Sequence, residues 1–437
     1  MQYIPNILFA ILLIVGVGYF VQNVRKLTRN IKLGKDVDRT DNKSERWKNM
    51  AMIALGQSKM VRRPIAGFLH IIVYLGFVII NIEVLEIVID GLTGQHRIFT
   101  KVLPDSVYGF LIGSFEVLAV LVLVAVIVFW IRRNIVKLKR FLSAEMKGWP
   151  KSDGNIILYF EVVLMTLFIV MNASDLHFQH AGHGNVISQY IAPLFEGNAD
   201  MAHIVERTTW WIHIAGILVF LNYLYYSKHL HILLAFPNTW YANLKPKGQF
   251  TNDSNVTKEV KLMMDPNADP FAAPAEGEDE GEPEKFGASD VMDLNWVQLM
   301  NSYTCTECGR CTSECPANLT GKKLSPRKIM MDTRDRLEEV GKNIDANKGK
   351  FVDDGKSLLN DYITTEELWA CTSCNACVEA CPVNIDPLSI IIEMRRYLVM
   401  EQSAAPMELN NMMSNIENNG APWPYNQMDR LNWANED

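Results

Sequence analysis

The chain begins with a series of apolar segments that are separated by polar loops. Five of these segments are long enough, or nearly long enough, to cross a lipid bilayer as helices. They cover Ile4–Val21, Ile65–Ile89, Val107–Ile131, Ile156–Asn172 and Thr208–Tyr226. The first segment has no charged region before it and no small-residue cleavage site, so we expect a retained span rather than a signal peptide. The pattern predicts a helical membrane domain over residues 1–242.

The positive charges of the loops predict the orientation of this domain. Residues 23–63 contain twelve Lys or Arg residues and residues 132–154 contain seven, whereas residues 91–107 contain two and residues 173–206 contain none. Lysine and arginine accumulate in cytoplasmic loops. We therefore expect the N-terminus outside and the C-terminal half in the cytoplasm. The expected location is the inner (cytoplasmic) membrane of a bacterium.

The composition changes after the last apolar segment. The stretch Asp265–Asp290 contains nine acidic residues and one lysine among Pro, Ala and Gly, and such a segment cannot bury a core. We predict an acidic flexible linker at 243–292, a soluble domain at 293–400 and a C-terminal tail at 401–437. The chain of 437 residues has a net charge of −7 and no basic patch with interleaved aromatics outside the membrane flanks. Nucleic acid is therefore not an expected partner.

All eight cysteines lie in two short motifs of the soluble domain. Residues 305–316 are CTECGRCTSECP and residues 371–382 are CTSCNACVEACP, so both have the spacing C-x2-C-x2-C-x3-C-P. In this motif three cysteines ligate one [4Fe–4S] cluster and the fourth ligates the other cluster. The rule assigns the first cluster to Cys305, Cys308, Cys311 and Cys381, and the second to Cys371, Cys374, Cys377 and Cys315.

Structural zinc and disulfide bonds are the alternatives for these cysteines. Zinc sites usually show two C-x2-C pairs, without a third cysteine three residues on and a fourth before proline. Disulfide frameworks spread their cysteines through small secreted domains, whereas reduced cysteines suit a cytoplasmic domain. The 55 residues between Cys315 and Cys371 include helix-like stretches at Pro326–Val340 and Thr365–Ala370, so we expect an α-helical domain.

Three histidines in or beside the predicted spans indicate haem. His70 lies near the cytoplasmic start of the second span, His213 near the outer start of the fifth, and His231 just past its cytoplasmic end. Histidine is an axial haem ligand, and ionisable residues are rare in spans without a function. On one continuous helix, His213 and His231 would share a face about 27 Å apart and could not ligate the same iron. We predict that His70 and His231 ligate one haem b, with Gly67 giving space for the porphyrin.

Other ionisable residues leave alternatives open. A second haem at His213 has no histidine opposite it in the second span, so its other ligand would come from the outer loop. The loop histidines, which are equally compatible with solvated positions, are His177, His180, His183 and His203. His229 is interpreted as an interfacial residue. Glu83 and Glu116 are candidates for a quinone pocket or a proton path, or for hydrogen bonds between helices.

These features together resemble known membrane-bound redox proteins. The histidines make the membrane half similar to the five-span b-haem subunit of respiratory nitrate reductase and to the membrane subunit of heterodisulfide reductase. The segments CTECGRCTSECPANLTGKKLSPRKIMMDTRD and LWACTSCNACVEACPVNIDPLSIIIEMRR resemble the dicluster domain of heterodisulfide-reductase-like iron–sulfur oxidoreductases. SKHLH and PWPYNQMDRLNWA resemble the membrane-bound members that couple electron-transferring flavoprotein to menaquinone. The resemblance implies a mainly α fold, in which a five-transmembrane-helix haem-b-type bundle precedes an α-helical dicluster [4Fe–4S] ferredoxin domain.

The resemblance also implies a function. A membrane-anchored electron-transfer subunit would pass electrons from a cytoplasmic flavoprotein through two [4Fe–4S] clusters and haem b to the quinone pool. The alternatives are a quinol-oxidising anchor that feeds a cytoplasmic heterodisulfide-type reductase, and a membrane redox sensor. The chain has no nucleophile–base constellation and no G-x-G-x-x-G motif, so no catalytic residue is assigned.

The family also suggests a protein partner. Fused relatives continue into cysteine-rich CCG domains, which this sequence does not show, so a separate CCG-type iron–sulfur subunit is an expected partner. Trp423, Tyr425 and Trp433 of the tail are the candidate docking residues, since aromatic side chains are enriched at interface anchors. The alternative is a tail that packs on its own iron–sulfur domain.

Overall fold

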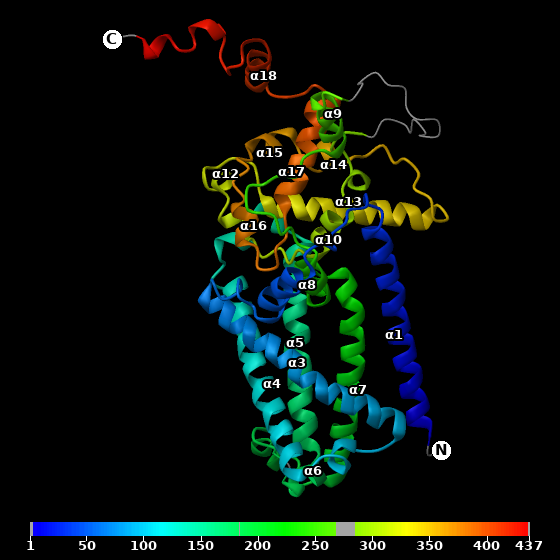
Figure 1. Cartoon of the computed structure of the whole chain (residues 1–437). Coiled ribbons are helices and arrows are strands. Elements are labelled where there is room, and N and C mark those ends of the chain that lie inside the picture. Colours follow the sequence, from blue (N-terminus) through cyan, green and yellow to red (C-terminus); the bar gives the residue numbers. More distant parts are fainter. Residues whose placement is uncertain (1–2, 183, 268–284, 436–437) are drawn as a thin grey trace.

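The computed structural model describes residues 3–182, 184–267 and 285–435. Five long helices form a bundle, and a smaller helical domain packs on one end of that bundle (Figure 1). Within the described residues, β pairing is limited to two isolated bridges, Lys35 with Asn295 and Leu359 with Ile363. The prediction of a mainly α chain with two helical parts is confirmed.

In the part of the chain that the structure describes, five helices are long and apolar enough to cross a membrane. They are α1 (Ile4–Ile31), α3 (Pro64–Thr93), α4 (Asp105–Asn134), α5 (Trp149–Ser174) and α7 (Ala199–Tyr223), the last extended to Tyr226 by a 3₁₀ turn. In the order α3, α4, α5 and α7, each helix packs against the next, and α1 packs against α3 and α7. The five predicted spans are therefore present, and each helix is longer than the apolar segment that predicted it.

The first helix shows why the helices exceed their apolar segments. Along its first half the apolar side chains are exposed on the outside of the bundle, as suits contact with lipid; they include Ile4, Ile7, Ile11 and Ile14. Its last turns contact the second domain instead. Arg29 forms an ion pair with Asp345, and the Asn30 amide donates a hydrogen bond to the Tyr303 hydroxyl at 3.0 Å. Polar contacts with the second domain thus stabilise the turns of α1 that follow its apolar residues.

Short helices occupy the connections. α2 (Lys43–Met50) and a π-helical turn precede α3, α6 (Leu176–Ala181) follows α5, and α8 (His231–Trp240) and α9 (Ser254–Met264) follow α7. The 3₁₀ turns of the bundle are Ile98–Lys101, Lys139–Phe141, Ala144–Met146, Ser188–Tyr190, Ala192–Leu194 and Lys228–Leu230.

The second domain is built from eight helices around one core. They are α10 (Trp296–Thr304), α11 (Arg310–Ser313), α12 (Pro316–Leu319), α13 (Pro326–Ala346), α14 (Leu358–Asp361), α15 (Thr365–Ala370), α16 (Ala376–Ala380) and α17 (Pro387–Arg396). Leu299, Ile329, Leu337 and Ile390 are fully buried in this core. The two stretches predicted to be helical are α13 and α15, so that prediction is confirmed.

The end of the predicted linker belongs structurally to this second domain. Ala288 and Val291 are buried in its core, and the Asp290 carboxylate accepts a hydrogen bond from the buried Arg336 at 2.8 Å. Earlier in the same stretch, α9 is helical, and residues 268–284 lie outside the described residues.

The tail extends away from the second domain (Figure 1). Its helix α18 (Met407–Asn419) has no buried residue, and the three aromatic residues Trp423, Tyr425 and Trp433 are exposed. The alternative of a tail packed on its own domain is therefore not what the structure shows.

A buried cluster of charges joins the two domains. Lys228, just after the end of α7, forms an ion pair with Glu307 of the first cysteine motif, and its ammonium lies 3.7 Å from the Asp153 carboxylate of α5. Glu307 also accepts a hydrogen bond from Arg334 of α13 at 2.8 Å. The Lys228 and Glu307 side chains are only 9% and 2% exposed. Burial alone would raise the pKa of Glu307, but Lys228 and Arg334 outweigh it and lower that pKa.

Replacing Lys228 by Met should destabilise the docked structure. The change leaves two buried carboxylates without their ammonium, and breaking a buried pair in this way costs about 3–5 kcal/mol. The thermal unfolding midpoint of the purified protein in detergent should fall accordingly. In the control Lys323→Met, the lost partner Glu366 and the lysine itself are exposed, so the midpoint should hardly change. Equal midpoints for the two variants would contradict this role of Lys228.

Candidate metal centre

The two cysteine motifs fold into loops of the same backbone shape. The third and fifth positions have positive φ in both, at Glu307 (55°) and Gly309 (71°) and at Ser373 (55°) and Asn375 (60°). A short helix, α11 or α16, starts directly afterwards. Positive φ is unfavourable for residues other than glycine, so its repetition at matching positions indicates a shared requirement. Turns of this kind direct backbone N–H groups to one side, as they do at anion and iron–sulfur sites.

The cysteines of the two motifs come together in space. Cys305, Cys308 and Cys311 line one cavity together with Cys381 of the other motif, and Cys377 also reaches its wall. All eight cysteines are free thiols rather than disulfide-bonded. The meeting of Cys381 with the first motif is the arrangement that crossed ligation requires.

The surroundings of the sulfur atoms suit metal-bound thiolates. Burial raises the pKa of Cys305 to about 12 and that of Cys381 to about 11, so these sulfurs would ionise only beside strong positive charge. The metal ions of a cluster supply such charge. Backbone N–H groups also donate to sulfur, from Ser373 to Cys371 at 3.4 Å and from Ile385 to Cys381 at 3.3 Å. The donor set therefore fits iron–sulfur clusters.

Both motifs contact the loop that leads into α3. The Arg310 guanidinium, between two cysteines of the first motif, donates to the carbonyl oxygens of Lys59 at 3.2 Å and Met60 at 3.3 Å. The Lys59 ammonium donates to the Asn384 side chain at 2.8 Å and to the Val378 carbonyl at 3.3 Å, beside the second motif. The cysteine loops are thus fixed to the bundle end from which His70 extends.

His70 and His231 are brought together, as predicted. Their ring centroids lie 6.4 Å apart, with the ring planes at 44°. Two imidazoles on opposite sides of one iron would have centroids about 6 Å apart, given metal–nitrogen bonds of about 2 Å. His231 Nδ1 lies 3.1 Å from the Lys228 carbonyl oxygen, which leaves Nε2 available to a metal, and His70 Nδ1 is buried without a hydrogen-bond partner among the described residues. The separation of the two rings is the one that a pair of haem-ligating imidazoles would require.

The route by which His231 reaches this position differs from the prediction. α7 ends at Tyr223, Ser227 is extended, and His231 is the first residue of the separate helix α8. The buried Asp153 stabilises this break by accepting a hydrogen bond from the Ser227 hydroxyl at 2.7 Å. The prediction that His213 and His231 share one face of a continuous helix is therefore wrong.

The expected role of Gly67 is also wrong. A Cβ atom at this position would lie 2.8 Å from the Cα of Val61 and 2.9 Å from the Met60 carbonyl oxygen. The space beside Gly67 is filled by the loop before α3, and not left open for a porphyrin. The glycine instead lets this loop pack closely on α3. The carbonyl groups of the same loop accept the hydrogen bonds from Arg310.

His229 lies in the same group as the predicted haem ligands. Its ring is 5.4 Å from that of His231 and 5.3 Å from that of Phe220, and burial lowers its pKa to about 3. The interpretation as an interfacial residue did not foresee this packing, because the turn that returns His229 towards the bundle is formed by Asp153, far away in sequence.

His213 stands apart from the other histidines. It is 2% exposed on α7, its ring packs 6.2 Å from Phe168, and Nδ1 has no hydrogen-bond partner among the described residues. His177 and His203 line a different cavity, which does not include His213, and His180 is exposed. The loop residue His183 lies outside the described residues.

Glu83 of α3 and Glu116 of α4 form hydrogen bonds inside the bundle. Arg97 donates to Glu83 at 3.0 Å, and Glu116 accepts from Asn172 at 3.2 Å and from Ser188 at 2.5 Å. This arrangement favours the hydrogen-bonding alternative for these acids. Sequence reasoning missed Arg97, although it is one of two Lys or Arg residues in the loop between α3 and α4.

A family comparison decides the nature of the cysteine domain. Residues 304–385 match the 4Fe-4S dicluster domain family. The chain carries a domain for two [4Fe–4S] clusters. The zinc and disulfide alternatives are thereby set aside.

Relatives of known description align with most of the chain. The "Probable iron-sulfur-binding oxidoreductase FadF" of Bacillus subtilis is 29% identical over 98% of this chain and 61% of its own length. The "EtfAB:quinone oxidoreductase" of Syntrophomonas wolfei is 26% identical over 98% of this chain and 59% of its own length. A "Probable membrane-anchored ferredoxin" of Chromohalobacter salexigens is 32% identical over 34% of this chain and 24% of its own length.

These relatives are distant. The chain spans about three-fifths of the length of the first two, and no solved structure matches it. At this level the resemblance to membrane-anchored dicluster iron–sulfur oxidoreductases is confirmed.

Proposed function

We propose that this protein passes electrons between an electron-transferring flavoprotein, EtfAB, and menaquinone of the membrane quinone pool. The observation that carries the proposal is a dicluster domain docked on the end of a five-helix bundle at which two histidines face each other. The name of the Syntrophomonas wolfei relative, which aligns with 98% of this chain, supports EtfAB and a quinone as partners.

The cysteines hold the two clusters in the crossed arrangement. One set is Cys305, Cys308, Cys311 and Cys381, and the other is Cys371, Cys374, Cys377 and Cys315. The shared cavity of Cys381 and the first motif supports this assignment. Cys374 is exposed, so the second set faces the side that a soluble flavoprotein can reach. The first set adjoins the bundle through Arg310.

His70 and His231 hold one haem b. Their ring separation and the free Nε2 of His231 support this assignment, whereas His213 has no histidine partner among the described residues. Bound clusters and haem supply one-electron chemistry. The chain supplies positions and surroundings: Lys228 orients His231 through its carbonyl oxygen, and backbone N–H groups stabilise the charge on sulfur.

The dicluster domain lies in the cytoplasm and the N-terminus lies outside, in the inner membrane of a bacterium. The loops richest in Lys and Arg, which the positive-inside rule assigns to the cytoplasm, are those that contact the dicluster domain. Arg62 pairs with Glu379 and Arg63 with Glu314 at 2.9 Å. The same charges therefore support both the orientation and the docking.

Replacing Cys315 by Ser should alter the cluster of the other motif. The electron paramagnetic resonance signal of the cluster held by Cys371, Cys374 and Cys377 should change, while the signal of the first cluster stays as in the native protein. The matched variant Cys381→Ser should have the reverse effect. A change confined to the cluster of the mutated motif would overturn the crossed assignment.

Removing His70 should abolish the low-spin b-haem spectrum. Both His70→Ala and His231→Ala should lose the ferrous band, because each removes one axial ligand. His229→Ala, which changes the neighbouring ring, should retain it. If His229→Ala loses the band while His231→Ala keeps it, His229 is the ligand and the assignment is wrong.

The function itself is tested with the full chain in menaquinone-containing liposomes. Reduced EtfAB should reduce menaquinone only when the protein is present. In Cys374→Ser this reaction should fail, because the exposed second cluster set receives the electrons. Haem reduction by menaquinol without transfer from EtfAB would favour the quinol-oxidising anchor. Absence of both reactions would leave the redox sensor and overturn the proposal.

A further inference from the structure

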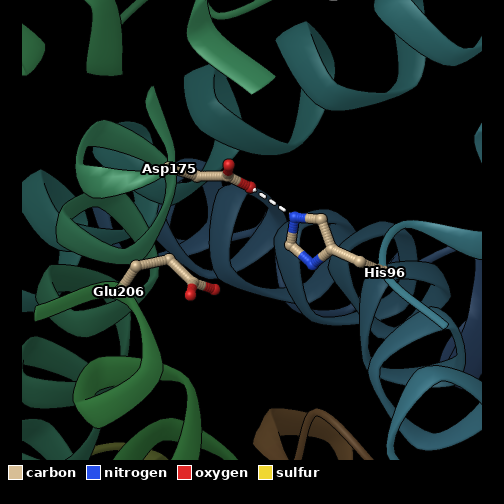
Figure 2. A group of neighbouring side chains, drawn as sticks. All are labelled: His96, Asp175 and Glu206. Carbon is tan, nitrogen blue, oxygen red and sulfur yellow. Dashed lines mark hydrogen bonds and ion pairs between the residues drawn. The ribbon is translucent and has the colours of Figure 1, made fainter. Parts of the chain in front are cut away.

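Three polar side chains point towards one another in Figure 2. One of them, Asp175, directly precedes α6, which lies at the end of the bundle away from the dicluster domain (Figure 1). His96 follows α3, Asp175 connects α5 to α6, and Glu206 lies on α7. One nitrogen or oxygen atom from each lies within 4.8 Å of the other two. His96 Nε2 is 2.9 Å from the Asp175 carboxylate. In Figure 2 Asp175 and Glu206 lie on one side of the group and His96 lies on the other. We propose that these residues form a zinc site.

The chemistry of the donors selects the metal. Histidine nitrogen and carboxylate oxygen are both zinc ligands in proteins, and Zn²⁺ takes four ligands, of which one can be water. A mixed nitrogen–oxygen set of this kind is less suited to Ca²⁺ or Mg²⁺, which prefer oxygen alone. His177 and His203 line the same cavity of about 420 Å³, and water can supply the fourth ligand.

The burial of the ligands distinguishes this site from a surface cluster. Asp175 and Glu206 are 6% and 5% exposed, whereas the His96 side chain is 47% exposed. The carboxylates are therefore held in place by the fold, and the imidazole leaves an open side through which an ion can enter. Buried carboxylates are costly unless cations or hydrogen bonds compensate them.

The surrounding charges leave room for an added cation. Arg97 is shared among Glu83, at 3.0 Å, and Asp175, at 3.6 Å, and Arg207 pairs with Glu206. Five carboxylates are connected through Arg97, its chain neighbours and Asn172, namely Glu83, Glu86, Asp90, Glu116 and Asp175, whereas Glu206 and Arg207 form a separate pair. A divalent ion would add compensating positive charge to the carboxylates of Asp175 and Glu206.

The ion would connect three elements of the bundle at one point. His96 follows α3, Asp175 follows α5 and Glu206 lies within α7, so the metal would cross-link these three helices. In the absence of metal the His96–Asp175 hydrogen bond joins only two of them. The proposal concerns the opposite end of the bundle from the clusters and does not depend on the proposed function.

The test uses purified full-length protein with its clusters intact, chelator-treated and then titrated with zinc chloride. The wild type should retain one zinc per chain after gel filtration, and X-ray absorption at the zinc edge should show only nitrogen and oxygen ligands. Zinc should also raise the thermal unfolding midpoint, since an ion that binds the folded state stabilises it.

Variants separate this site from other zinc binding. His96→Ala and Glu206→Gln should each weaken zinc binding at least about tenfold, because the loss of even an outer-shell partner costs that much. Both should keep the cluster absorbance of the wild type, and His180→Ala, an exposed histidine of α6 outside the cavity, should bind zinc normally. Sulfur in the zinc shell, no retained zinc, or unchanged affinity in both ligand variants would overturn the proposal.

Discussion

The ion pair between Lys228 and Glu307 holds the two halves of the molecule in register. Lys228 immediately follows Ser227, where the chain leaves α7, and Glu307 lies between two cysteines of the first motif. Asp153 stabilises the same turn from α5, and Arg334 holds the other side of Glu307 from α13. A single buried cluster therefore places the cysteine loop and the histidine segment relative to each other, and both proposed cofactor sites depend on it.

The basic loops of the bundle also contact the dicluster domain. Arginines and lysines before α3 meet acidic residues and carbonyl groups of the cysteine loops, as Arg62 does with Glu379 and Lys59 with Val378. Arg327 extends from the dicluster domain in the opposite direction, to Glu145 at 2.7 Å. Complementary charge at the interface means that the domain can dock in only one orientation without leaving buried charges unpaired.

Periodicity and spacing were sufficient to predict the overall architecture. The apolar segments predicted five long helices, and the doubled cysteine motif predicted a helical dicluster domain, because both signals are local in sequence. The break at Ser227 was not predicted, since Asp153 stabilises it from 74 residues away. For the same reason Arg97 was missed: its partners Glu83 and Asn172 come from two different helices. Local patterns show which elements form, whereas buried polar contacts between distant elements decide how they end.

The length of α1 determines how far the dicluster domain lies from the lipid. Its 28 residues extend over about 42 Å, whereas the hydrocarbon layer of a bilayer is about 30 Å thick. The C-terminal turns of α1 therefore extend beyond the lipid. There Asn30 donates to Tyr303, and Arg29 forms an ion pair with Asp345. A ferredoxin on a flexible tether would approach and leave the membrane by diffusion. Here the end of α1 holds the dicluster domain at a fixed distance from the lipid, so the fold sets the distance between the clusters and the membrane.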